Sequence, residues 1–82
     1  MYLLTFRGNS PQGGPESSVR CFSRPASARK AMVTAYNDVM TRYELGRRPI
    51  SYMVIKEDDH IRIEFSEYIF DWKVLKAIPE DK

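Results

Sequence analysis

Two alternating segments joined by a short acidic turn constrain the fold of this chain more than any other feature. Apolar side chains recur at every second position over residues 50–54 and again over 61–65, and the acidic segment 57–59 separates them. A two-residue turn at 58–59 gives the pairs Lys56 with Ile61, Val54 with Ile63 and Tyr52 with Phe65. This register puts the apolar residues of both strands on one face, which predicts an antiparallel hairpin with one buried face.

The segment from Arg24 to Glu44 predicts the one helix. Ser23 is placed to cap it, Pro25 lies in the first turn, and Gly46 stands where a left-handed residue could end it. An apolar stripe at helical spacing consists of Ala28, Met32, Ala35, Val39 and Tyr43. We therefore expect the helix to lie across the sheet, and the small alanines to allow a close approach.

Val33, Tyr36 and Met40 lie beside this stripe and form a shoulder on the helix. They widen its apolar arc to about 200°, whereas about 100° is enough to cover one face. Curled strands or a loop could bury the shoulder inside the domain. Alternatively, the shoulder binds a partner or a second copy of the chain, because Met and Tyr are enriched at such surfaces.

The remaining segments complete a small sheet. Residues 1–7 and 19–22 have the composition of strands, and alternation favours a third strand over 67–78, with a capped helix as the alternative. Between the first two strands, residues 8–18 hold three of the four glycines and predict a flexible loop. The glycine spacing there is that of a phosphate-binding loop, but the Lys and the Ser or Thr which that motif requires are missing. We expect 79–82 to be a C-terminal tail.

These elements predict a single α+β domain over 1–82, with one helix packed on an antiparallel sheet of three to five strands in the order β-(β)-α-β-β-β. The expected core consists of Leu4, Phe6, Ala28, Met32, Ala35, Val39, Tyr52, Val54, Ile61, Ile63 and Phe65.

The charges are distributed unevenly along the chain. Residues 1–56 hold nine Lys and Arg against three Asp and Glu, whereas 57–82 hold four against eight, so the net charge of +2 is a near-cancellation. Arginine dominates the basic part and suits planar contacts with carboxylate or phosphate. If the asymmetry is also spatial, two charged surfaces could bind partners: a basic one at Arg47 and Arg48, and an acidic one made of Glu57, Asp58, Asp59 and Glu64.

The residues that carry catalysis and metal binding are scarce. One cysteine and one histidine exclude an internal disulfide, a zinc site built from four Cys and His ligands, and any two-histidine metal motif. Cys21 stands in an alternating apolar run and is expected to be buried, and His60 is expected at the surface beside the turn, facing Glu57. Asp58 and Asp59 are expected to form the turn rather than to bind a metal. We therefore expect no catalytic residues, no metal and no cofactor.

Three function classes remain, and a non-enzymatic protein-binding module is the preferred one. Five Tyr, one Trp and eight Arg are residue types enriched at interface hot spots. In size alone, the chain is similar to the small inhibitors encoded by phages and mobile elements, anti-CRISPR proteins among them, and its partner could be a nucleic-acid-binding complex. The second class is a nucleic-acid-binding domain that uses the arginine-rich helix ends with stacking on Tyr36 and Tyr43. The third is a small metal-free ribonuclease.

The expected location is the cytoplasm. The first residues lack the basic and apolar regions of a signal peptide, and no apolar run approaches the about 20 residues that span a bilayer. A lone cysteine also fits a reducing compartment. We accordingly expect no membrane partner.

Overall fold

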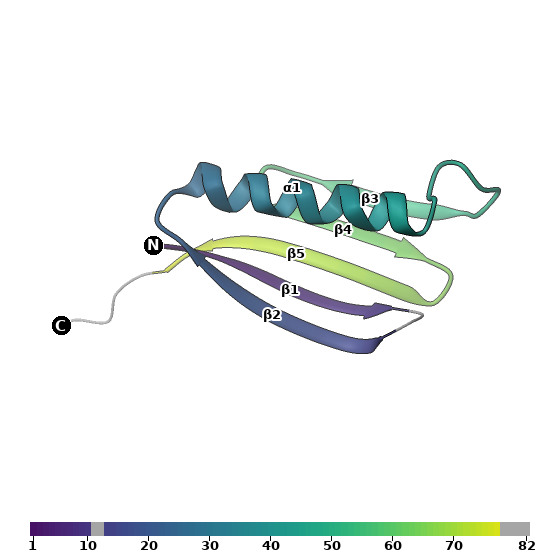
Figure 1. Cartoon of the computed structure of the whole chain (residues 1–82), viewed down its shortest axis with the longest axis horizontal. Helices are drawn as coiled ribbons and strands as arrows, with labels where there is room; N and C mark the ends of the chain where they lie inside the picture. The colour runs from purple at the N-terminus through teal and green to yellow at the C-terminus, as the bar shows by residue number, and fades with distance from the viewer. Residues whose placement is uncertain (11–12, 78–82) are drawn as a thin grey trace.

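The computed structural model describes residues 1–10 and 13–77 and consists of one helix on one face of a five-stranded antiparallel sheet (Figure 1). The elements in chain order are β1 (Tyr2–Ser10), β2 (Gly14–Phe22), α1 (Pro25–Arg42), β3 (Tyr52–Lys56), β4 (His60–Phe65) and β5 (Tyr68–Lys76). The strands lie side by side in the order β2-β1-β5-β4-β3. The predicted α+β class and element order are confirmed.

The hairpin predicted from the alternating segments is β3–β4, and its register is confirmed pair by pair. Val54 lies opposite Ile63 and Tyr52 opposite Phe65. The Glu57 amide donates to the His60 carbonyl at 2.8 Å and closes the turn. The ambiguous segment 67–78 contains the strand β5, whose buried residues alternate with exposed ones as a strand on a one-sided core requires.

The flexible loop expected over 8–18 is wrong for most of its length. β1 runs to Ser10 and β2 starts at Gly14, so the two strands pair through residues 8–10 and 14–18. Gly14 has φ +69°, which favours glycine, and the Ser10 hydroxyl accepts a hydrogen bond from the Gly13 amide at 2.8 Å. Turn-forming composition therefore did not exclude strand structure in 8–10 and 14–18, and proline is tolerated on an edge strand such as β2.

The ends of α1 differ from the expected ones. The N-cap is Arg24 in extended conformation and not Ser23, and no side chain caps the helix, while Pro25 does lie in the first turn. The helix ends at Arg42, before the expected Glu44. Glu44 is the first residue in left-handed conformation, at φ 53°, and Gly46 follows at φ 86°. The chain therefore leaves the helix earlier than the glycine position indicates.

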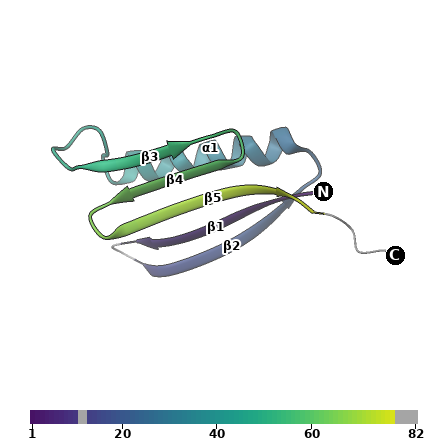
Figure 2. The same ribbon diagram turned by 180° about the vertical axis from the view of Figure 1, so that it is seen from behind.

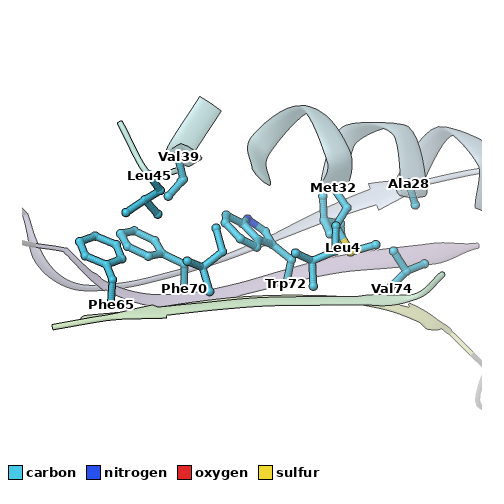
Figure 3. Packing of buried hydrophobic residues seen from close by; sticks show 11 residues of the cluster. Leu4, Ala28, Met32, Val39, Leu45, Phe65, Phe70, Trp72 and Val74 are labelled. Atoms are coloured by element: carbon cyan, nitrogen blue, oxygen red, sulfur yellow. The ribbon is translucent and has the colours of Figure 1, made fainter. Parts of the chain in front are cut away.

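The core lies between α1 and the inner face of the sheet (Figure 3). Its buried residues are Leu4, Ala28, Met32, Val39, Leu45, Ile61, Ile63, Phe65, Phe70, Trp72 and Val74. The Phe6 ring stacks on Trp72 with centroids 5.4 Å apart. A Cβ at Gly8 would come within 2.5 Å of the same ring, so glycine makes room for it.

The predicted core differs from the observed one in two ways: some predicted residues are not fully buried, and some buried residues were not predicted. Tyr52 is 38% exposed, and Phe6, Ala35 and Val54 are only partly buried. Four buried residues were not expected in the core: Leu45, Phe70, Trp72 and Val74. Three of these four belong to β5, the strand whose conformation the sequence left open. The tail expected at 79–82 lies outside the described residues.

No helix among residues 1–10 and 13–77 lies on the other face of the sheet. Figure 2 looks onto this face, with the strands in front of α1. We call it the uncovered face and define it by the strand side chains that point away from α1: Leu3, Thr5, Arg7, Asn9, Pro15, Ser17, Val19, Cys21, Met53, Ile55, His60, Arg62, Glu64, Ile69, Asp71, Lys73 and Leu75.

Candidate functional site

The helix shoulder is partly used by the core. Val33, Tyr36 and Met40 are half-buried and pack against the buried cluster. The Lys56 ammonium lies 5.0 Å from the centroid of the Tyr36 ring, so the end of β3 covers that residue. The shoulder therefore offers a partner much less free apolar surface than the helical projection indicates.

The predicted basic surface and the predicted acidic surface lie at opposite ends of α1. Arg47 and Arg48 follow the C-terminal end of α1, whereas the acidic turn between β3 and β4 lies beside the start of α1 (Figure 1). Arg48 contacts Glu44 at 3.3 Å. The expected basic and acidic surfaces are thus separate, and the basic one is partly neutralised.

The acidic turn is tied to the helix by an ion pair. Arg29 Nε donates to Asp59 Oδ1 at 2.7 Å. This hydrogen bond lowers the pKa of Asp59 from its ordinary 3.8 and raises the pKa of Arg29. Glu57 and Asp58 remain exposed at the turn. Because Arg29 comes from the basic half of the chain, folding cancels part of the asymmetry that the sequence shows.

The uncovered face gathers most of the exposed large apolar side chains. Five of them lie there, each between 37% and 61% exposed: Val19, Met53, Ile55, Ile69 and Leu75. The pairing of β3, β4 and β5 places Met53, Ile55 and Ile69 at one end of the face, and Val19 and Leu75 lie toward the other. Exposed apolar groups gathered on one surface indicate an interaction site more strongly than scattered ones do.

An ion network occupies the centre of this face. The Asp71 carboxylate contacts His60 Nε2 at 2.8 Å and Arg62 Nη1 at 3.2 Å, and the Asp71 side chain is only 19% exposed. Arg62 Nε also donates to Glu64 Oε2 at 2.7 Å. That hydrogen bond, supported by Asp71, raises the pKa of Arg62. The network holds four side chains in place on the sheet.

A shallow depression adjoins this network. Its volume is about 300 Å³, and it lies over β1, β4 and β5, where it is lined by Arg7, Gly8, Asn9, Arg62, Ile69 and Asp71. Arg7 lies directly opposite Asp71 in the register of β1 and β5. The depression gives the uncovered face a concave region with hydrogen-bonding groups.

A second hollow, which we call the α1–β2 groove, lies on the helix side. α1 leaves β2 uncovered, and a pocket of about 240 Å³ opens between them over Leu4, Phe6 and Trp72. A shallower hollow of about 580 Å³ continues it along the helix. Both are lined by Arg20 from β2 and Asp38 from α1. No sequence pattern indicates this groove, because it depends on where the helix crosses the sheet.

The two residues considered for nucleophilic catalysis lie apart. Cys21 is on β2 and is exposed, which corrects the expected burial: β2 is an edge strand, and nothing covers it on this face. His60 is on β4, three strands away, or about 14 Å at the usual strand spacing. In the described part of the chain, no group of three or more His, Cys, Asp and Glu is placed to hold a metal ion.

Of the expected binding residues, the structure places Glu64 in the network on the uncovered face and Glu57 at its margin, where Glu57 Oε1 lies 3.7 Å from His60 Nδ1. Asp71 and Ile69 were missed because the strand favoured over 67–78 was not assigned a register, so the partners of Arg62 across the sheet were not identified. Pairing this favoured strand with the preceding hairpin would have placed Asp71 opposite Arg62 and revealed the network. The signal was present in the alternation of β5.

Over residues 1–10 and 13–77, the structure contains no helix with the length and hydropathy that a bilayer crossing requires. Comparisons with protein-family models, with curated proteins and with solved structures gave no match.

Proposed function

We propose that this protein is a non-enzymatic binding module that docks on a partner protein through its uncovered face. The observation that supports this most is the gathering of Val19, Met53, Ile55, Ile69 and Leu75 around an ion network. Protein interfaces combine apolar contact with satisfied polar groups and are enriched in Met and Arg. The uncovered face has this composition.

The ion network prepares the face for desolvation. A single charge buried under a partner loses its hydration at a high cost, whereas charges that are already paired lose less. Arg62 keeps two carboxylate partners, and Asp71 keeps two basic ones. A partner can therefore cover the centre of the face without having to supply countercharges.

The proposed action is stoichiometric. A module of this kind occupies a surface on its partner and blocks or bridges what binds there, as the small inhibitors encoded by phages and mobile elements do. No turnover is required, and the separation of Cys21 from His60 agrees with that.

Nucleic acid is less well supported as the partner. Among the described residues, no Phe, Tyr or Trp lies on the uncovered face, so it offers no stacking platform. Tyr43 contacts Phe65 and Phe70 in the core, with ring centroids 5.4 and 5.8 Å apart, and its hydroxyl is buried. Of the two tyrosines expected to stack on bases, one is thus enclosed and Tyr36 is covered by Lys56.

The test is affinity capture from cells of the source organism with three tagged proteins: the wild type, the face variant Ile55→Lys/Ile69→Lys, and the control Ala26→Lys/Asn37→Lys. The control adds the same two charges at exposed positions of α1. We expect the wild type and the control to capture the same partner and the face variant to lose it, with all three equally folded by circular dichroism. Equal capture by the face variant would refute the proposal.

A further inference from the structure

The outer edge of β2 is an unusually long and open strand edge. β2 has nine residues, and its inner side pairs with β1 along its whole length. Within the described residues, no strand pairs with its outer side, and every residue from Pro15 to Cys21 is exposed. Such an edge presents a row of amide and carbonyl groups ready to pair with another strand.

The helix leaves space beside this edge. The α1–β2 groove separates the helix from β2, and Glu16, Ser18 and Arg20 line it from the strand. A strand added outside β2 would therefore extend the sheet without meeting α1. The opposite edge differs: β3 has five residues, and its Lys56 already contacts the helix through Tyr36.

The charges of β2 are self-complementary. Glu16 and Arg20 stand two residues before and two residues after Ser18, and all three line the groove on the same face of the strand. In an antiparallel pair of two copies centred on Ser18, Glu16 of each copy lies opposite Arg20 of the other. Shifting the strands by two residues in either direction would break both ion pairs.

We propose that the partner of this edge is a second copy of the chain, docked as an antiparallel β2–β2 pair centred on Ser18. The interface is isologous, as a two-fold dimer requires, and it joins the two sheets into one of ten strands. Pro15, which has no amide hydrogen, lies opposite Cys21 at the end of the paired segment, where it costs one hydrogen bond. The inference does not depend on the proposed function, because it uses the edge of the sheet and not its uncovered face.

Disulfide trapping tests the register. In a Cys21→Ser background, Ser18→Cys places two thiols directly opposite one another, within the Cα separation that a disulfide bridges. The control Cys21→Ser/Val54→Cys puts the thiol at the centre of β3. We expect mild oxidation to give a covalent dimer for the Ser18 variant only. A dimer for the Val54 variant only, equal dimer for both, or none for either would overturn the proposal.

Charge reversal tests the ion pairs. Glu16→Arg places like charges opposite one another twice in each dimer, and so does Arg20→Glu. By sedimentation at high micromolar concentration, we expect each single variant to self-associate at least about tenfold more weakly than the wild type. A mixture of the two restores both ion pairs and should form heterodimers. Wild-type self-association by either single variant, or a mixture that stays monomeric, would contradict the pairing.

Discussion

The two faces of the sheet are built from the same strands and differ in almost every property. On β4 and β5 most residues that face α1 are buried, as Ile61, Ile63 and Trp72 are, whereas their neighbours on the other side carry the ion network of Arg62 and Asp71. One helix can cover one face, so the alternation along each strand decides what is core and what is surface.

The uncovered face is less polar than this division requires. An antiparallel sheet with one solvated face usually shows polar residues there, yet five large apolar side chains remain exposed on this one. The covered face therefore accounts for the stability of the fold, whereas the uncovered face carries more apolar surface than stability requires. Substitutions on the two faces should therefore differ in their effect on the free energy of unfolding.

Removing the central aromatic of the covered face should have the largest effect. Trp72 is 3% exposed and stacks on Phe6 and Phe70. We expect Trp72→Ala to lower the free energy of unfolding by about 3–5 kcal/mol, because it removes buried area and leaves a cavity. Urea denaturation followed by circular dichroism measures this. A loss below about 1 kcal/mol would show that the core does not centre on Trp72.

Breaking the ion network should have an intermediate effect. Asp71→Asn keeps the shape of the side chain but removes the charge that His60 and Arg62 contact. We expect a loss of about 1–2 kcal/mol, since hydrogen bonds to charged groups exceed neutral ones. The matched control is Lys73→Gln on the same strand and face, which should change stability by less than about 0.5 kcal/mol. Equal effects of the two variants would show that the network does not order this face.

The ion pair between the acidic turn and α1 should contribute a smaller, pH-dependent amount. Arg29 lowers the pKa of Asp59 below 3.8, so the pair stabilises the fold above that pH, and its contribution is lost as pH falls through the lowered pKa. The wild type should therefore be slightly more stable than Asp59→Asn near neutral pH, and the difference should vanish in acid. Thermal unfolding of both proteins across this range is the measurement, and a difference that grows toward low pH would contradict the assignment.

Substitution of the exposed apolar residues should have the smallest effect on stability. Ile55 is 40% exposed on an edge strand, and we expect Ile55→Lys to change the free energy of unfolding by less than about 0.5 kcal/mol. Chemical denaturation is again the measurement. A loss comparable with that of Trp72→Ala would place Ile55 in the core and remove it from the proposed interface.

The sequence predicted those parts of the fold in which local signals agree. The β3–β4 register followed because the alternation and the turn selected the same pairs. The loop predicted over 8–18 was wrong because the glycine and proline content was taken to exclude strand structure, whereas the two flanking strands continue to Ser10 and from Gly14. The predicted burial of Cys21 was wrong because burial depends on whether a strand lies at an edge of the sheet. The order of the strands is not encoded locally in the sequence.

The candidate site was less predictable than the fold. Glu64 was expected to bind a partner, but its network depends on Asp71, whose strand the sequence did not settle. In the helical projection the shoulder had no assigned contact within the domain. The structure shows that Lys56, at the end of β3, covers Tyr36. Surfaces arise from long-range pairing, and alternation within single strands does not specify it.

Oxidative footprinting of the methionines tests directly whether the partner binds the uncovered face or the helix shoulder. Met53 lies on the uncovered face and Met40 on the helix shoulder, so each candidate surface carries one reporter. Oxidation rates of both would be measured by mass spectrometry for the free protein and for its complex with the captured partner. We expect the partner to slow the oxidation of Met53 and to leave that of Met40 unchanged. Protection of Met40 with Met53 unchanged would contradict it.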